Sequence, residues 1–390
     1  MADPQHQPRA RAAVPHPRIA RFGDLLIPAA SAAELGYRMP AEWEAQSCVW
    51  VSPPTNSETW PRCLMQASRQ FDAWVDELRR FAPVCTPQSL GISTDDAWVR
   101  DYGPIFVVRD QASGNGDGAE QEPATRRVDR AVTTELALHD FFFNSWGGKY
   151  EGARPRDDMV PQHLARWLGS PIWVHDFALE GGAIEPNGRG TLLTTEQCLL
   201  NPNRNPGASR EKIEAILGEA FNATRIIWLP GGITGDDTDG HVDDVARFVN
   251  ADTVAAATAP EGHPDHDMLA RNLQVLRRAR DQDGNKLNII ELPMPEPIFY
   301  DYPPDRFDEG GRQQLPASHA NFLIANGGVF VPTFGQASDE QALRIMEQAM
   351  PDHEIVPVRS EWLVVGLGAM HCLSMPQPAV RYNIRGAVLR

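Results

Sequence analysis

The chain has 390 residues, of which 42% are apolar and 23% charged, and its formal net charge is -16. This composition is typical of a soluble globular protein with ample length for a core. The negative charge argues against nucleic acid or an anionic membrane surface as a partner. No apolar run approaches the length of a membrane span, and the N-terminus lacks the apolar middle of a signal peptide. The five cysteines form no CxxC pair, which argues against a disulfide framework or a cysteine zinc site and favours a reduced, cytoplasmic setting.

The N-terminal segment differs in composition from the rest of the chain. Residues 1–21 contain four prolines and four arginines but a single acid, Asp3. Such a stretch cannot bury enough apolar surface to fold alone, so residues 1–35 are predicted to form a disordered N-terminal tail. Residues 36–390 are predicted to form one folded domain.

Hydrophobic periodicity then predicts an alternation of strands and helices. Residues 110–130 are rich in glycine and charge and are predicted to form an exposed loop. Residues 241–249 alternate in polarity, which predicts a strand with His241 and Asp243 on one face. The other predicted strands are 47–52, 105–109, 172–174, 190–195, 253–257 and 329–333, and the predicted helices are 62–80, 158–168, 209–220, 268–280 and one that begins at Ser338.

The same order of elements recurs along the chain, each time introduced by a polar motif. These motifs surround Asp101, Glu180, His241, Asn321 and Cys372. Intervals of roughly 50–80 residues are in the range of repeat architectures. The pattern predicts an α/β fold in which similar units form a ring, so that the leading motifs meet near one axis.

The stretch from Gly235 to Val249 carries five carboxylates and one histidine. Because such a cluster is costly to bury without a cation, either a metal ion or a positively charged substrate is the expected occupant. The run lacks EF-hand spacing, and His241 with Asp243 is weak evidence for zinc. We therefore expect the remaining acids, Asp236, Asp237, Asp239 and Asp244, to cap the turn or face solvent, and we expect no metal and no cofactor.

Cys372 follows His371 in a run fixed by glycines and prolines, GLGAMHCLSMPQP. A thiol beside a histidine base can be an activated nucleophile, whereas a random cysteine is more often a small buried apolar residue. Several acids, a base and a thiolate suit attack on a carbon that already carries positive charge. A guanidinium is such a group, and carboxylates hold it by paired, charge-assisted hydrogen bonds.

Seven motifs in order resemble the agmatine deiminase and bacterial peptidylarginine deiminase family of the guanidine-modifying (pentein) superfamily. They run from about residue 38 to near the C-terminus: MPAEWE (39–44), WVRDYGP (98–104), WGGKY (146–150), EGG (180–182), DDTDGHVDDVARF (236–248), NFLIANGGVFVPTFG (321–335) and the motif of His371 and Cys372. The resemblance implies a five-bladed, pseudo-symmetric α/β propeller with its site on the axis. It also implies hydrolytic deimination without a cofactor, most simply of agmatine to N-carbamoylputrescine in polyamine (putrescine) formation.

The resemblance further implies a role for each matching residue. Cys372 would attack the guanidinium carbon, Asp101 and Asp243 would bind its nitrogens, and Trp98 would stack on the cation. His241, oriented by Glu180, would protonate the leaving ammonia and then activate water. Asp101 could alternatively pair with Arg100 or Arg247.

Two other functions stay open beside agmatine deimination. One is deimination of peptidyl or free arginine, and the other is a non-catalytic propeller that serves as a binding module. The expected partner is a small cationic guanidino compound, and the sequence is compatible with a homo-oligomer.

Overall fold

The computed structural model describes residues 25–111, 133–150, 154–303 and 311–380. The predicted loop 110–130 and most of the predicted tail, residues 1–24, lie almost wholly outside these ranges. The described part of that tail packs on the body: the indole of Trp173 donates to the carbonyl of Ala30 at 2.8 Å, and Ala32 is buried. Among the described residues no helix is long and apolar enough to cross a membrane.

Five three-stranded sheets share one plan within the described residues. In each, a short antiparallel pair is followed by a parallel pair whose connection contains a helix, as parallel pairing requires. The strand orders are β17 (Ser374–Pro378), β1 (Gln46–Val51), β2 (Val84–Cys85); β3 (Ile105–Gln111), β4 (Thr133–Phe142), β5 (Ile172–Ala178); β6 (Glu185–Pro186), β7 (Thr191–Thr195), β8 (Arg225–Leu229); β9 (Ala246–Asn250), β10 (Thr253–Thr258), β11 (Asn288–Pro293); and β14 (Leu323–Ala325), β15 (Gly328–Thr333), β16 (Glu354–Arg359).

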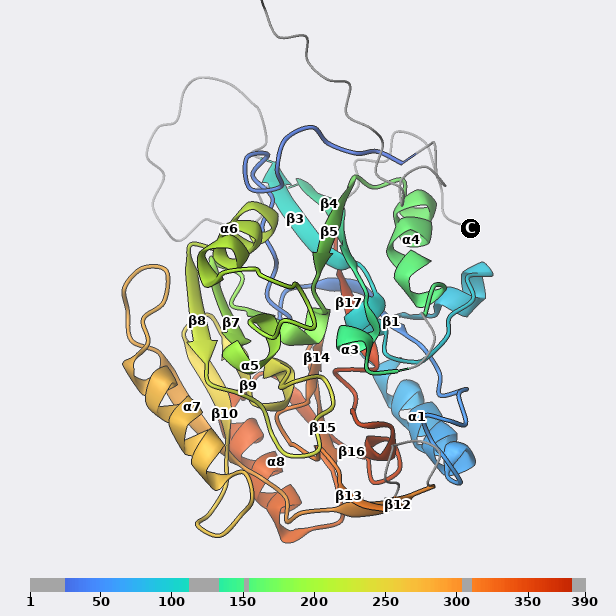
Figure 1. Ribbon diagram of the computed structural model, residues 1–390, viewed down its shortest axis with the longest axis vertical. Coiled ribbons are helices and arrows are strands. Elements are labelled where there is room, and N and C mark those ends of the chain that lie inside the picture. The colour runs from blue at the N-terminus through green and yellow to red at the C-terminus, as the bar shows by residue number, and fades with distance from the viewer. Residues whose placement is uncertain (1–24, 112–132, 151–153, 304–310, 381–390) are drawn as a thin grey trace, which may run out of the picture.

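The connecting helices lie on the outside of the molecule, around the strands (Figure 1). They are α1 (Leu64–Leu78), α4 (Val160–Leu168), α6 (Arg210–Phe221), α7 (His266–Arg278) and α8 (Ala337–Ala349). Each buries one apolar face, as Phe71, Trp74 and Leu78 do in α1, because an amphipathic helix must cover a sheet. A hairpin of β12 (Phe299–Tyr302) and β13 (Gly311–Gln314) stands apart from the five sheets.

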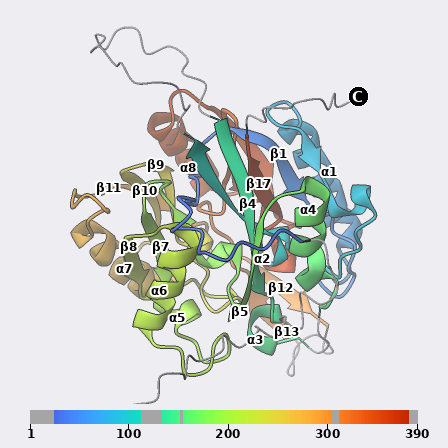
Figure 2. The same cartoon turned by 90° about the horizontal axis from the view of Figure 1, so that it is seen from above.

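The prediction of an α/β fold built from similar units is confirmed by these sheets. The first strand and the last strand of the chain complete one of them, since β1 pairs with β17. Seen from above, β1 and β17 lie side by side near the middle of the molecule (Figure 2). The sheets do not close into a barrel, and a five-bladed propeller stays a prediction.

Turns, loops and short helices, rather than strands, carry the polar motifs. Asp101 lies on α2 (Val99–Tyr102), Glu180 precedes the 3-10 helix η5 (Gly181–Ala183), and His241 precedes the 3-10 helix η6 (Val242–Asp244). Asn321 lies in a loop and Cys372 in a turn. The other short helices are α3 (Ser145–Gly148), α5 (Glu196–Leu199) and the 3-10 helices η2 (Pro87–Leu90), η4 (Asp157–Met159) and η7 (Val364–Gly366). The prediction that His241 and Asp243 lie on one face of a strand is wrong. His241 is the N-cap of η6, and β9 begins only at Ala246, because Gly240 and Asp239 hold a left-handed turn that leads into η6.

Candidate active site

Gly182 marks the point where the polar motifs meet. A β-carbon at this position would lie 2.6 Å from Nδ1 of His241, 2.9 Å from Oδ1 of Asp101 and 3.1 Å from Oδ2 of Asp243. These distances are shorter than ordinary van der Waals contact, so only glycine fits without movement. The glycine of the EGG motif therefore allows three side chains from two other segments of the chain to approach one point.

Cys372 joins this group through Asp243. Its Sγ lies 3.5 Å from Oδ2 of Asp243, and the side-chain amide of Asn321 donates to Sγ at 3.1 Å. Burial raises the pKa of the thiol well above its ordinary value, and the charges of Asp243, Asp244 and Asp101 raise it further. No hydrogen bond joins the thiol to His241 among the residues that the structure describes.

The two aspartates of the site have different pKa values. Burial raises the pKa of Asp101 to about 6, although His241 acts to lower it. Burial also acts to raise the pKa of Asp243, but the hydrogen bond with His371 and the charges of His371 and His241 bring it below its ordinary value. Asp101 accepts hydrogen bonds from the indole of Trp146 and the amide of Gly182, at 2.9 and 3.2 Å. Oδ1 of Asp243 has no hydrogen-bond partner among the described residues and remains available to a ligand.

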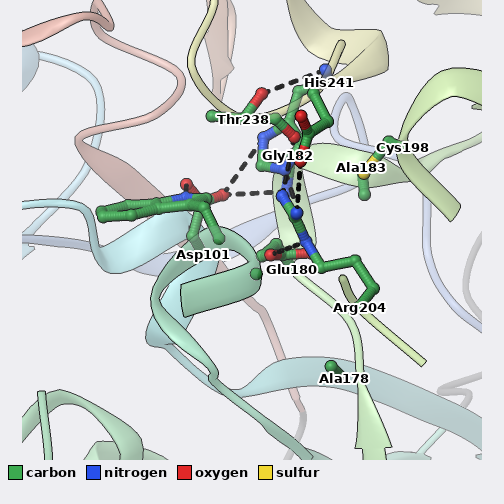
Figure 3. Close-up of polar contacts among 12 residues, drawn as sticks. Asp101, Ala178, Glu180, Gly182, Ala183, Cys198, Arg204, Thr238 and His241 are labelled. Carbon is green, nitrogen blue, oxygen red and sulfur yellow. Dashed lines mark hydrogen bonds and ion pairs between the residues drawn. The ribbon is translucent and has the colours of Figure 1, made fainter. Parts of the chain in front are cut away.

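His241 lies between two carboxylates, as Figure 3 shows. Its Nδ1 is 3.6 Å from Oδ1 of Asp101, and its Nε2 is 4.0 Å from Oε2 of Glu180. Burial acts to lower the pKa of His241, but Asp101, Cys198 and Glu180 together raise it well above its ordinary value. The guanidinium of Arg204 donates to the other oxygen of Glu180 at 2.6 Å and fixes this carboxylate. The imidazole is thus placed to carry a proton at either nitrogen.

A network of buried ion pairs and hydrogen bonds lies next to the site. Arg247 donates to Glu185 at 2.7 Å and to Glu42 at 2.9 Å, and Arg100 donates to the same Glu42 at 2.9 Å. His371 joins this network to the site, since its Nε2 lies 3.0 Å from Oε2 of Glu42 and its Nδ1 lies 2.7 Å from Oδ2 of Asp243. Burial acts to raise the pKa of Glu42, but Arg247, His371 and Arg100 hold it well below its ordinary value.

This network shows which residues the two buried arginines pair with. Arg100 pairs with Glu42, and Arg247 pairs with Glu42 and Glu185. No ion pair joins either arginine to Asp101 in the described part of the chain, so the alternative pairing of Asp101 is wrong. The imidazole next to the thiol in sequence, His371, contacts two carboxylates, those of Asp243 and Glu42. The role of His241 stays a prediction.

A narrow cavity of about 20 Å³, room for about one water molecule, gives access to the thiol. Trp98, which stacks on Trp60 at 5.2 Å between ring centroids, forms one wall. Gly368 allows this closeness, because a β-carbon there would lie 2.6 Å from the Trp98 ring and 3.0 Å from Cβ of Cys372. The lining consists of Thr59, Asp96, Trp98, Asp101, Trp146, Tyr150, Arg154, Asp237, Thr238, Gly366, Leu367 and Cys372.

Three other acids of the run make hydrogen bonds within the protein. Asp239 accepts from Arg204 and Lys149, both at 2.6 Å, and Asp236 accepts from the amide of His241 at 3.0 Å. Asp244 is buried and accepts from Asn321 at 2.8 Å, so the expectation that it caps the turn or faces solvent is wrong. These contacts tie the run to neighbouring segments of the chain.

The sequence did not predict several of the residues that contact the site residues. Glu42 and Gly182 belong to the quoted MPAEWE and EGG motifs, but the motifs gave no sign of their contacts. Asn321 begins another motif, and only the fold shows that its amide reaches the thiol. Arg204 and Cys198 lie in segments with no signal of function.

Two groups of side chains among the described residues could hold a metal ion. One is Glu180, Cys198 and His241, and the other is Asp243, Asp244 and Cys372, each with ligand atoms within 4.8 Å of one another. Both share residues with the site, so a metal ion would compete with its chemistry. No cradle for an organic cofactor is evident in the cavity lining, which is narrow and acidic.

Known proteins are similar to this chain over most of its length. The model of the Porphyromonas-type peptidyl-arginine deiminase family matches residues 38–378. An agmatine deiminase of Pseudomonas aeruginosa (strain LESB58) is 35% identical over 378 residues, covering 89% of this chain and 96% of that protein. The solved agmatine deiminase of Enterococcus faecalis has a TM-score of 0.80 and 30% identity, over 91% of this chain and 99% of that one. A substrate-bound agmatine deiminase of C. jejuni, which carries a cysteine-to-serine substitution, has a TM-score of 0.72 and 25% identity, over 88% and 97%.

Proposed function

Because the chain belongs to the Porphyromonas-type peptidyl-arginine deiminase family, we propose that it hydrolyses a guanidinium group to a ureido group and ammonia. The observation that carries the proposal is the meeting of the Cys372 thiol with Asp243, and of Asp101 with His241, around Gly182. Acids on both sides of a buried thiol attract a cation and give no such attraction to a neutral carbonyl substrate.

In the proposed reaction, Cys372 attacks the guanidinium carbon while Asp101 and Asp243 hold its nitrogens. The thiol of the free protein is held protonated by burial and by the neighbouring acids, which raise its pKa. A guanidinium placed among these acids offsets their charge and favours the thiolate, so that the substrate helps to activate its nucleophile. The thiol proton then moves to the carboxylate of Asp243 or Asp101, and the carbon–sulfur bond forms.

His241 completes the cycle as acid and then as base. Protonated His241 delivers a proton to the departing nitrogen, which leaves as ammonia and yields an S-alkylthiouronium on Cys372. The same imidazole then takes a proton from water, the resulting hydroxide attacks the thiouronium carbon, and the carbon–sulfur bond breaks. Glu180, fixed by Arg204, supports the charged imidazole. No step of this cycle needs a cofactor.

Agmatine is the proposed substrate, with N-carbamoylputrescine as the product. The cavity lining contains three carboxylates, those of Asp96, Asp101 and Asp237, against one guanidinium, that of Arg154. This balance favours a substrate with a second positive charge, and the small volume favours a small molecule. Trp98, which lines the same cavity, is proposed to stack on the guanidinium. The relatives named agmatine deiminase support the same choice.

Free arginine is the second candidate, because Arg154 lies in the same lining. Its guanidinium stacks on Trp146 and Tyr150, at 5.0 and 4.9 Å from the ring centroids, and could pair with a substrate carboxylate. Steady-state ammonia release from agmatine, free arginine and an arginyl peptide tests the proposal. The highest kcat/KM should be found for agmatine, and no turnover of any of the three would refute deimination.

We also propose that the five three-stranded sheets are the blades of a pseudo-symmetric propeller. Their common strand order and the meeting of the leading motifs around Gly182 support this arrangement. The proposed setting is the cytoplasm, where a reduced Cys372 would persist.

A further inference from the structure

A second group of side chains shares His241 with the site but does not include Cys372. A carboxylate oxygen of Glu180, Sγ of Cys198 and a ring nitrogen of His241 all lie within 4.8 Å of one another. At 1%, 0% and 0% exposure these residues are sealed from solvent. Cys198 lies on α5, where its amide donates to Thr195 at 3.2 Å. The proposed deimination cycle uses the imidazole and Glu180 but not this thiol.

The group contains buried polar atoms without hydrogen-bond partners. Among the described residues, neither ring nitrogen of His241 nor Oε2 of Glu180 has one. Such atoms are rare in folded proteins and point to a ligand or to a group that moves. The unpartnered carboxylate oxygen lies 4.0 Å from the imidazole Nε2, and the Cys198 thiol lies within 4.8 Å of a ligand atom of each of these two residues.

We propose that Glu180, Cys198 and His241 form an inhibitory site for a soft divalent cation such as Zn²⁺. Carboxylate, thiolate and imidazole are the ligand types that zinc takes in three-ligand sites with one position open. Calcium and magnesium, which prefer oxygen ligands, do not suit this set.

The surroundings match those of natural zinc ligands. A zinc-bound histidine usually directs its other ring nitrogen at a carboxylate, and Nδ1 of His241 faces Oδ1 of Asp101 at 3.6 Å. A zinc-bound carboxylate is usually hydrogen-bonded as well, and Arg204 holds the other oxygen of Glu180 at 2.6 Å (Figure 3). Tetrahedral zinc separates a nitrogen and an oxygen ligand by about 3.4 Å. The 4.0 Å gap between His241 and Glu180 would therefore close by roughly 0.6 Å.

Zinc on Nε2 would remove the acid–base function of His241. The metal-bound imidazole keeps one proton on Nδ1 and cannot take a second, so it can neither protonate the leaving nitrogen nor accept a proton from water. The binding carboxylates and the cavity at Cys372 stay in place. Inhibition should therefore lower kcat and leave KM nearly unchanged. Because the metal displaces the thiol proton of Cys198, inhibition should strengthen as pH rises.

The kinetic arm of the test rests on the proposed deimination and uses the full chain with Zn²⁺ as the probe. Zinc should lower kcat by about 10²-fold or more, with full recovery on addition of chelator. Each protein is compared with itself, with and without zinc. Cys198→Ser should lose the inhibition, and Cys85→Ser, a control at a half-buried thiol outside the group, should keep it. Persistent inhibition in Cys198→Ser, or a rise in KM alone, would place the metal at Cys372 with Asp243 and Asp244 and overturn the proposal.

The spectroscopic arm does not depend on activity. Co²⁺ is added to Cys372→Ser, in which the nucleophile can neither react nor bind metal. A thiolate-to-Co²⁺ charge-transfer band in the near ultraviolet is expected, and it should vanish when Cys198→Ser is added to the same protein. No band, or a band that survives the second substitution, would refute the site. A chain that shows the band but turns over no guanidino compound would keep the metal site and lose the proposed function.

Discussion

Replacing Gly182 by alanine tests the geometry of the site with a single methyl group. The new β-carbon would lie 2.6 Å from Nδ1 of His241, whereas ordinary contact begins at 3.4 Å. The imidazole or the EGG segment must therefore shift by 3.4 - 2.6 = 0.8 Å. A misplacement of about 1 Å can slow catalysis roughly 10²-fold, which corresponds to about 2.7 kcal/mol of transition-state stabilisation. Gly182 does not have a positive φ, so the effect comes from crowding and not from backbone strain.

The assay is ammonia release, measured as kcat/KM, together with urea unfolding. Gly182→Ala should lose about 10²-fold in kcat/KM and about 1–3 kcal/mol of stability through overpacking. The matched control is Gly218→Ala in α6, where a β-carbon meets only the carbonyl of Ala223 at 3.4 Å. It should keep full activity and gain about 0.5–1 kcal/mol of stability. A folded Gly182→Ala protein within about threefold of the unmodified kcat/KM would refute the crowded arrangement.

Three further predictions concern the pH profile, the ion network and the thiol. Because the pKa of Asp101 is raised to about 6, this group loses its charge as pH falls through that value, so kcat/KM should fall below pH 6; a pH–rate profile that stays flat there would contradict this. Glu42→Gln removes the carboxylate that accepts from both Arg247 and Arg100. The substitution should lower the free energy of unfolding, measured in urea, by about 3–5 kcal/mol. A loss under about 1 kcal/mol would show that the network is not coupled. Asn321→Ala removes the donor to Sγ of Cys372. Because a hydrogen bond to a charged group contributes about 1.5–3 kcal/mol, thiol alkylation and turnover should both slow at least tenfold. Unchanged alkylation would refute a role for this amide.

The repeating elements could be predicted because each unit carries its own local signals. The helix predicted over 62–80 is α1 (Leu64–Leu78), and the strand predicted over 329–333 is β15 (Gly328–Thr333). Both depend on the spacing of apolar residues within one window, which is visible in the sequence. The repetition of these units also led to the prediction of a ring, which stays a prediction.

The alternating run at His241 misled the prediction for a physical reason. Alternation of polarity over 241–249 matches a strand, but the side chains of Asp236 and Thr238, five and three residues earlier, accept from the amide of His241 and hold it in a turn. The periodicity of polar and apolar residues gives no information about such hydrogen bonds, so the strand prediction was wrong for its first half and right from Ala246.

The supporting network could not be predicted because it joins distant segments. Glu42 and His371 are 329 residues apart, and Glu42 and Arg247 are 205 apart. Nothing in the sequence around any of them says which partner it will have. The residues proposed to contact the substrate, by contrast, were found because the motifs that carry them match those of a known family.

Trapping the covalent intermediate tests the central claim most directly. The protein is mixed with agmatine, quenched with acid during turnover, digested and analysed by mass spectrometry. The account predicts that the peptide containing Cys372 gains the mass of agmatine less one ammonia, and that Cys372→Ser shows neither the adduct nor turnover. An adduct on another residue, or turnover by Cys372→Ser at the unmodified rate, would contradict it.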